Sequence, residues 1–317
     1  MTVKHVVLGT GAIGRAVMEE LLKRGESVRM VNRSGKMDEV PAGVELVASD
    51  LYDPAKVREL TRDAEVVYQA SQPNYTQWPE KFPLLQKSII EGLSGSSAKL
   101  VLVENLYMYG DTNGKPLTED TPYHAHTRKG RVRAEISNAA FQAHREGSVT
   151  VTSARGGNFF GPWGTDSTMG ARVFYPLLRG KPAQLIGRTD IPHSHTYTKD
   201  FGRALVLLGE HHEADGQVWH VPNDQPLMTQ GDLVRMFAEE AGVEPKRSSM
   251  GKLMLAIGGL FIPEAKETLE MMYEFDKPFI VDASKFEKAF GMKATPIREA
   301  IRETVHWYKS HMELEHG

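Results

Sequence analysis

Short apolar runs alternate with amphipathic stretches along the first half of the chain. The apolar runs have the length of buried β-strands, and the stretches between them repeat their apolar positions at helical spacing. One run, Lys99–Val103, is almost uniformly apolar, as expected of a strand buried on both faces of a parallel sheet. The predicted strands are 3–8, 27–31, 44–47, 66–70, 99–103 and 149–154, and the predicted helices are 15–22, 56–64, 82–93 and 127–144. This alternation predicts an α/β fold with a doubly wound parallel sheet.

Three glycines follow the first predicted strand with the spacing G-x-G-x-x-G, in the turn Gly9-Thr10-Gly11-Ala12-Ile13-Gly14. In such a turn the first glycine allows the tight bend, the second lets the backbone approach a pyrophosphate, and the third lets helix and strand pack closely. The N-terminus of the following helix would present free N–H groups to the phosphates. An ordinary glycine-rich turn is the alternative, but the strand–turn–helix context favours a bound dinucleotide.

The second half of the chain has a looser pattern. It predicts short strands at 183–186 and 218–221, a helix at 201–210, and a helix start at Thr229-x-x-Asp232, which has the form of a capping signature. We therefore expect a Rossmann domain formed by residues 1–160 and 195–240, and a smaller C-terminal substrate-binding domain formed by 161–194 and 241–317. The segment 250–272, rich in Met, Leu and Gly, would either line a substrate site or pack between the domains.

The end of the second predicted strand bears on the choice of cofactor. NAD-specific folds usually place an acidic residue there to accept hydrogen bonds from the ribose, whereas this chain has Asn32-Arg33-Ser34. A guanidinium and a hydroxyl suit a 2′-phosphate, so NADP is favoured and NAD remains possible. The alternative is a solvated arginine in a polar turn.

Composition narrows the range of partners. The chain has 317 residues, a net charge of −3 and no cysteine, which excludes disulfides and thiolate chemistry and suits a reducing cytoplasm. Interspersed charges argue against nucleic acid or a membrane surface as a partner, and the longest apolar stretch is too short to span a bilayer. The basic run 128–133 is predicted to be a solvated helix start. We expect no metal site and predict solvated side chains for the candidate ligands His193, His195, His211 and His212.

The loop 71–79 follows a predicted strand, and open α/β sheets bind ligands at the carboxyl ends of their strands. Its Gln, Asn, Tyr and Trp side chains could line the mouth of a site. Trp78 is equally well explained as a packing anchor.

Five separate segments, in the expected order, give the chain its likeness to a known family. It resembles an extended or atypical short-chain dehydrogenase/reductase of the NAD-dependent epimerase/dehydratase group. The segments are Gly9–Gly14, Asp50-Leu51, Tyr109-Gly110, 158–162 and 281–291. The resemblance implies that Asp50 and Leu51 lie at the adenine, that Ala70, Ser71 and Gln72 lie along the cofactor, and that Asn158 and Phe159 border the nicotinamide and substrate.

The chain departs from this family at the residues that carry out catalysis. Asn105 stands where the family has Ser or Thr, and counting back from Glu135 places Thr127 and Arg131 at the positions of the family's Tyr-x-x-x-Lys pair. The family chemistry needs a phenol whose pKa is lowered by a neighbouring ammonium group, and threonine is a poor substitute. Arg131 could still supply charge and bind the ribose, as Asn105 could orient a substrate oxygen.

Any acid must then come from another residue. Tyr107 is the leading candidate, because residues 105 and 107 point to the same side if the strand continues that far. His126 is the reserve candidate, with a pKa better suited to neutral pH.

Three functions fit these observations, and the first is the main interpretation. The first is NADP-linked reduction of a carbonyl or related group on a small, partly apolar molecule by a cytoplasmic protein that could form a homodimer. The second is epimerisation or dehydration of a nucleotide sugar. The third is a non-catalytic, NADP(H)-sensing regulator, which the lost tyrosine and lysine would favour.

Overall fold

The computed structural model describes residues 3–258 and 263–312 of the chain. These residues form two compact units. The first unit runs to Gly110 and includes Tyr123–Arg155 and Phe201–Val221; the second comprises Asp111–Pro122, Gly156–Asp200 and the chain from Pro222 onward.

The first unit is built on a seven-stranded sheet with the order β3-β2-β1-β4-β5-β6-β9, and every neighbouring pair is parallel. The order reverses between β1 and β4, which confirms the predicted doubly wound α/β topology. The strands are β1 (His5–Leu8), β2 (Val28–Asn32), β3 (Val44–Ala48), β4 (Val66–Gln69), β5 (Lys99–Glu104), β6 (Thr150–Arg155) and β9 (Val218–His220).

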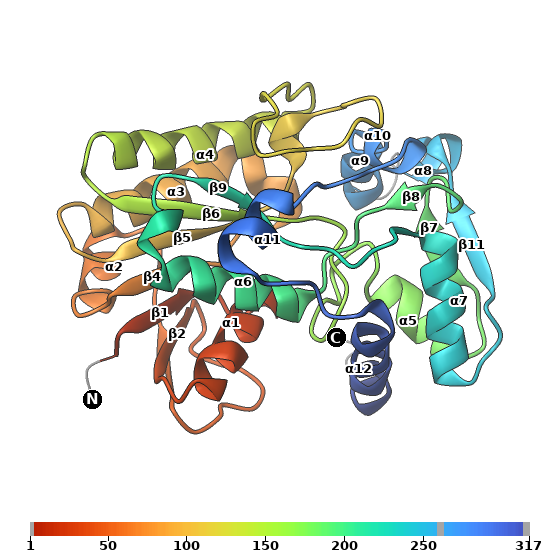
Figure 1. Ribbon diagram of the computed structural model, residues 1–317, viewed down its shortest axis with the longest axis horizontal. Coiled ribbons are helices and arrows are strands. Elements are labelled where there is room, and N and C mark those ends of the chain that lie inside the picture. Colours follow the sequence, from red (N-terminus) through yellow and green to blue (C-terminus); the bar gives the residue numbers. More distant parts are fainter. Residues whose placement is uncertain (1–2, 259–262, 313–317) are drawn as a thin grey trace. The chain divides into compact units, whose positions relative to one another are not determined.

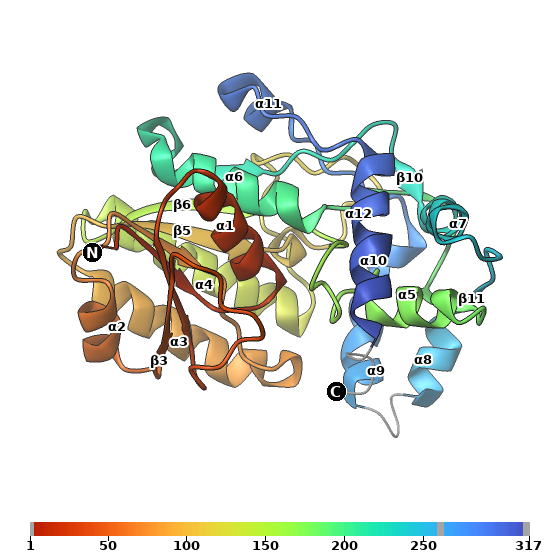
Figure 2. The ribbon, with the colours of Figure 1, turned by 90° about the horizontal axis from the view of Figure 1, so that it is seen from below.

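Helices cover both faces of this sheet, as parallel strands require. Figure 1 shows α3 and α4 on one face and α1 and α6 on the other, and Figure 2 shows the same layers from below. The helices of this unit are α1 (Ala12–Lys23), α2 (Pro54–Leu60), α3 (Trp78–Leu93), α4 (Arg128–Arg145) and α6 (Thr198–Glu210). The core between the sheet and α3 and α4 is aliphatic and aromatic, and it includes Trp78, Phe82, Ile89, Leu100 and Ile136.

The second unit has its own core, where α5 (Ala171–Leu178), α7 (Gln230–Ala241) and α12 (Ile297–Ser310) pack with β7 (Ala183–Ile186). Short pairs β7–β11 (Arg247–Met250) and β8–β10 (Pro192–His193 with Met228–Thr229) complete it. Its other helices are α8 (Lys252–Gly258), α9 (Pro263–Leu269), α10 (Tyr273–Asp276) and α11 (Ser284–Phe290). Leu255 and Met272 of the methionine-rich segment are buried in a small cluster with Phe275, and residues 259–262 of that segment lie outside the described residues.

Two differences from the sequence-based expectations have clear physical causes. The predicted boundaries placed residues 222–240 with the sheet, whereas α7 buries Leu233, Val234 and Phe237 in the core of the second unit. The predicted helix 82–93 begins earlier, at Trp78, because Pro79 suits the first turn of a helix. The predicted capping signature is confirmed, since Thr229 and Asp232 form a reciprocal capping box at the start of α7.

Candidate dinucleotide and catalytic site

The glycine turn shows which of its residues the protein's own packing requires. Gly9 has a φ of +119°, and a Cβ there would lie 2.8 Å from the carbonyl carbon of Ala70. A Cβ on Gly14 would lie 2.1 Å from the carbonyl oxygen of Gly9. Gly11 has an ordinary φ of −73°, and a Cβ there would meet no atom within 4 Å. The fold therefore requires glycine at 9 and 14, and it leaves open space in front of Gly11.

The open space lies at the N-terminus of α1, whose first residue is Ala12. The first N–H groups of a helix have no partner within the helix and carry a partial positive charge. An open glycine beside such a helix start is the geometry that a pyrophosphate needs. The residues present therefore fit a dinucleotide.

Predicted cofactor residues follow four adjacent strands of the sheet. Because β3, β2, β1 and β4 are parallel neighbours, their carboxyl ends share one edge, at the point where the strand order reverses. The residues that follow these ends are Asp50 and Leu51, Asn32 to Ser34, Gly9 to Gly14, and Ala70 to Gln72. The topology thus brings these four predicted segments to one edge.

The side chain of Asn32, at the end of β2, forms hydrogen bonds that stabilise the turn after the strand. Its Nδ2 donates to Thr10 Oγ1 at 2.9 Å and to the Lys36 carbonyl at 2.8 Å, and its Oδ1 accepts from Gly35 N at 2.6 Å. Arg33, the next residue, is exposed. The end of β2 therefore offers an exposed guanidinium and no carboxylate.

Arg15 was not singled out from the sequence, although it directly follows the last glycine of the motif. It is buried, and its Nε donates to the Thr10 carbonyl at 3.2 Å while its Nη1 donates to the Asp38 carbonyl at 3.0 Å. It thereby ties the glycine turn to the loop that follows β2. Its position could have indicated this role, because Arg15 is a charged residue in the otherwise apolar first turn of the helix.

The loops after β3 and β4 are held by short polar contacts. The exposed Asp50 accepts a hydrogen bond from Tyr52 N at 3.0 Å. Ser71 donates to Gln69 Oε1 from its backbone N at 2.8 Å and from its hydroxyl at 2.9 Å. These contacts fix the two loops at the shared edge.

Asn158 and Phe159 belong to the second unit. Asn158 has a φ of +50°, in the left-handed region, and its Nδ2 lies 3.5 Å from the Ser194 carbonyl. Phe159 is half-buried. Strained backbone of this kind is often found at functional sites.

The two residues that the resemblance places at the family's tyrosine and lysine positions form local contacts. Thr127 is the N-cap of α4, and its hydroxyl accepts from Gly130 N at 3.0 Å. Arg131 is exposed, and its Nη2 donates to the His126 carbonyl at 2.6 Å. Both side chains organise the start of the helix.

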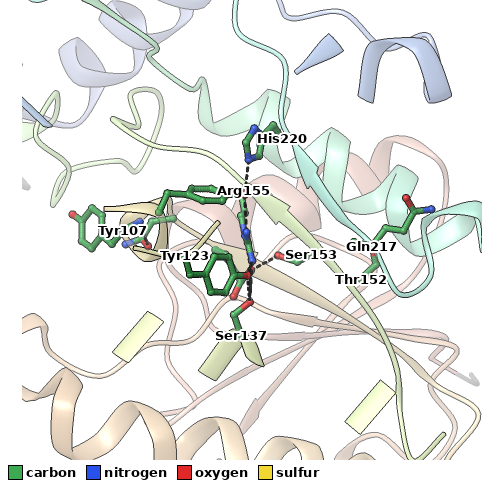
Figure 3. Close-up of polar contacts among 11 residues, drawn as sticks. Tyr107, Tyr123, Ser137, Thr152, Ser153, Arg155, Gln217 and His220 are labelled. Carbon is green, nitrogen blue, oxygen red and sulfur yellow. Dashed lines mark hydrogen bonds and ion pairs between the residues drawn. The ribbon is translucent and has the colours of Figure 1, made fainter. Parts of the chain in front are cut away.

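The condition under which Asn105 and Tyr107 would share a strand face is not met, because β5 ends at Glu104 and strand alternation does not extend to these residues. Asn105 Oδ1 accepts from Tyr107 N at 3.3 Å, which closes a turn before the short 3₁₀ helix η2 (Tyr107–Tyr109). The Tyr107 ring is half-buried and lies 6.1 Å from the ring of Trp78, centroid to centroid. Figure 3 shows Tyr107 pointing away from the neighbouring polar cluster.

That cluster surrounds Arg155 and was not predicted from the sequence. Arg155 ends β6, is fully buried, and donates from Nε to Glu104 Oε2 at 2.9 Å. Its Nη1 donates to the Tyr109 hydroxyl at 2.7 Å, and its Nη2 donates to Ser137 Oγ at 2.9 Å and to the Tyr123 hydroxyl (Figure 3). Glu104 raises the pKa of Arg155 despite the cost of burial. The sequence did contain one signal for this cluster, since Glu104 and Arg155 are charged residues at the last positions of two buried strands.

The cluster continues from Tyr109 to β9. The Tyr109 hydroxyl lies 2.9 Å from His220 Nε2, and burial raises the pKa of that hydroxyl. Arg155 donates to the same hydroxyl oxygen, so Tyr109 links the guanidinium to the imidazole. The network therefore joins the ends of β5, β6 and β9 and fixes the edge from which Asn105 emerges.

The prediction of a solvated basic helix start was wrong for Lys129 and Arg133, which are 0 % and 5 % exposed. Lys129 Nζ donates to the Tyr75 carbonyl at 2.7 Å and lies 4.0 Å from the centre of that ring. Arg133 Cζ lies 4.3 Å from the centre of the Trp78 ring and 4.6 Å from that of Phe82. Burial lowers the pKa of Arg133 to about 10, so it stays charged at neutral pH. Trp78 is thus a packing residue, and it shields a cation.

Histidines do not form a metal centre in the part of the chain that the structure describes, where no three His, Asp or Glu side chains are grouped to hold an ion. His212 is largely exposed, as predicted. The prediction was wrong for His193 and His195, which are buried in the second unit. Burial lowers their pKa values to about 4 and about 3. Within the same described residues, every helix is too short or too polar to cross a membrane.

The sheet order, the glycine turn and the free start of α1 define a Rossmann-type dinucleotide-binding protein. The chain belongs to the NAD dependent epimerase/dehydratase family, whose model matches residues 6–221. No curated protein matches the sequence.

Solved structures share the fold at low identity. The Bordetella bronchiseptica enzyme WbmH in complex with NAD+ is 18% identical, with a TM-score of 0.75 over 97% of this chain and 99% of that one. UDP-glucuronic acid 4-epimerase from Bacillus cereus, in complex with UDP-glucuronic acid and NAD, is 15% identical, with a TM-score of 0.78 over 96% and 99%. The epimerase Mth375 from Methanothermobacter thermautotrophicus is 16% identical, with a TM-score of 0.82 over 99% and 94%.

Proposed function

We propose that this protein binds NAD(P) at the Gly9–Gly14 turn and uses it in epimerase- or dehydratase-type redox chemistry on a small molecule, with nucleotide sugars as the first substrates to test. The observation that carries the proposal is Gly11, a glycine that the fold does not need and that faces open space at a helix N-terminus. The nucleotide-sugar class is supported by the family and by a similar structure that holds UDP-glucuronic acid and NAD. This evidence favours that class over simple carbonyl reduction by NADPH.

The residues proposed to hold the dinucleotide are those at the shared edge of β3, β2, β1 and β4. The α1 N-terminus would face the pyrophosphate, Asp50 and Leu51 the adenine, and Ala70 to Gln72 the path toward the nicotinamide. Arg131 and Asn105 would contact the ribose side, and Asn158 and Phe159 the nicotinamide and substrate. When bound, the dinucleotide supplies a hydride acceptor or donor.

We further propose a preference for NADP over NAD. The side-chain amide of Asn32 forms hydrogen bonds within its own turn, and the adjacent Arg33 is exposed. A guanidinium recognises a phosphate dianion through charge-assisted hydrogen bonds, whereas a ribose diol is usually bound by a carboxylate, and residues 32–34 include none.

For proton transfer we propose Tyr107, with Asn105 beside it in the same turn. Thr127 is unsuited to the role, because its hydroxyl caps α4 and has an alcohol's weak acidity. His126, whose carbonyl accepts from Arg131, is the second candidate. The side chain that exchanges this proton must reach the substrate oxygen directly or through one water molecule.

A regulatory protein that senses NADP(H) is the second candidate function. Its support is specific: both Thr127 and Arg131 are engaged in organising the helix start rather than forming a phenol–ammonium pair.

Calorimetric titration with the oxidised and reduced forms of both dinucleotides, followed by turnover assays on UDP-sugars and carbonyl compounds, tests the proposal. Binding with turnover of a UDP-sugar supports the first function. Micromolar binding without turnover of any compound supports the sensor, and absence of binding to all four dinucleotides refutes both.

A further inference from the structure

A small cavity lies inside the first unit, between the sheet and the helix pair α3 and α4. Its volume is about 10 Å³, which is room for one water molecule. Its lining combines apolar side chains with four polar ones: Phe82, Leu102, Val103 and Ile136, with Gln69, Gln86, Glu104 and Arg133.

Two of the polar lining residues have hydrogen-bond donors without a protein partner. They are Arg133 Nε and Gln86 Nε2, on side chains that are 5 % and 3 % exposed. A buried donor left unsatisfied destabilises the folded protein, and more so when it is charged. Two such donors on the same cavity point to a hydrogen-bond acceptor within it.

The same cavity also offers acceptors. Glu104 lines it, and the hydrogen bonds that Ser153, Arg155 and Ser137 donate to this carboxylate all go to Oε2, at 2.6, 2.9 and 3.3 Å. Gln69 lines it as well. An anion would satisfy the two donors but would sit against the Glu104 carboxylate, whereas a water molecule both accepts and donates.

We propose that this cavity binds one water molecule, which accepts hydrogen bonds from Arg133 Nε and Gln86 Nε2 and donates to Glu104. The water joins two charged groups that otherwise belong to separate contacts. It makes the buried polar network continuous from Arg133 through Glu104 and Arg155 to Tyr109 and His220.

The site would also position the loop that follows β4. Gln69 accepts both hydrogen bonds from Ser71, and Arg133 Nη2 donates to Gln72 Oε1 at 3.4 Å. Two lining residues therefore hold the two residues proposed to lie along the dinucleotide. This consequence, unlike the water itself, rests on the proposed function.

A crystal structure of the full chain at better than about 1.5 Å, grown without added ligand, tests the site directly. We expect one water peak within hydrogen-bond distance of Arg133 Nε and Gln86 Nε2, as for ordered internal waters. An empty cavity, or an Arg133 that contacts Glu104 directly, overturns the proposal. An anomalous peak there after a bromide soak overturns it in favour of an anion.

The variant Gln86→Met keeps the side-chain length and removes the donor. We expect loss of the water and a roughly three- to tenfold weaker affinity for NADP(H), the scale of one net hydrogen bond. Ile136→Val enlarges the same cavity without touching the polar groups, so it should lower stability and leave the affinity unchanged. Gln142→Met, on the exposed face of α4, is the control for the substitution itself.

The two proposals fail separately. If the wild-type protein binds no dinucleotide, the proposed function fails while the water peak still decides the site. If Gln86→Met loses the water but Ile136→Val lowers the affinity for NADP(H) by the same factor, the positioning role is refuted. If Gln86→Met does not fold, the wild-type peak and the bromide soak remain decisive.

Discussion

The fold does not require glycine at position 11, whereas a bound pyrophosphate would. The substitution Gly11→Val should therefore change dinucleotide affinity much more than stability. The backbone at Gly11 is extended, with φ −73° and ψ −174°, and a Cβ there meets nothing within 4 Å. Valine loses some preference for the N-cap position but reduces the entropy of the unfolded chain. These effects oppose each other, so we expect the free energy of unfolding to change by less than about 1 kcal/mol.

The effect on binding should be much larger. A valine side chain would fill the space that a pyrophosphate needs and would keep it from the N–H groups of α1. Each charge-assisted hydrogen bond is worth about 1.5–3 kcal/mol, so losing one or two costs roughly 10- to 10⁴-fold in affinity. Calorimetric titration with NADP+ and NADPH, together with urea unfolding of the same samples, measures both quantities.

Two further variants make the result interpretable. Gly14→Val places a Cβ 2.1 Å from the Gly9 carbonyl oxygen, so it should destabilise the fold by at least about 1–3 kcal/mol. Gly251→Val alters another glycine with open space around it, in the second unit, and should change neither stability nor affinity. Wild-type affinity for all four dinucleotides in folded Gly11→Val would refute the proposed site.

Three other predictions concern the cofactor choice, the proton donor and pH. Arg33→Ala should reduce the ratio of NADP to NAD affinity by roughly ten- to a hundredfold, and an unchanged ratio in paired titrations contradicts the assignment. Tyr107→Phe should slow a turnover step by roughly 10²–10⁴-fold with unchanged cofactor affinity, whereas wild-type rates would eliminate Tyr107 as the acid. Burial raises the pKa of Glu274 to about 8, so the folded protein keeps a proton there that the unfolded chain has lost. The contribution of Glu274 to stability should therefore fall by about 1 kcal/mol per pH unit from pH 6.5 to 7.5, while protonation of His193 and His195 in the unfolded chain opposes this trend at the lower end of that range. Urea unfolding of Glu274→Gln should lack this slope, and equal slopes in the two proteins would show that Glu274 is not its source.

The sheet and its glycine turn could be predicted because their signals are local. A near-continuous apolar run such as Lys99–Val103 already specifies a strand buried on both faces, and the turn after β1 combines spacing with context. The cap of α7 at Thr229 is also encoded within four residues. Features of this kind need no knowledge of what the chain packs against.

The polar clusters could not be predicted because tertiary register creates them. Glu104 and Arg155 meet because β5 and β6 pair with these two residues in register, which no local pattern reveals. Lys129 and Arg133 are one turn apart on α4, and a basic sequence does not say which face will meet Tyr75 and Trp78. The end of β5 at Glu104 likewise depends on where its pairing with β6 stops.

The capping role of Thr127 makes a tyrosine at this position costly to introduce. Its hydroxyl satisfies the Gly130 N–H, so a change to tyrosine alone would uncap α4 at a cost of about 0.5–2 kcal/mol. The new phenol would gain no ammonium in return, because the neighbouring cation is an arginine held on the His126 carbonyl. A change at position 127 alone therefore loses stability without creating a phenol–ammonium pair. Introducing a tyrosine–lysine pair in the laboratory calls for changing positions 127 and 131 together and stabilising the helix start elsewhere.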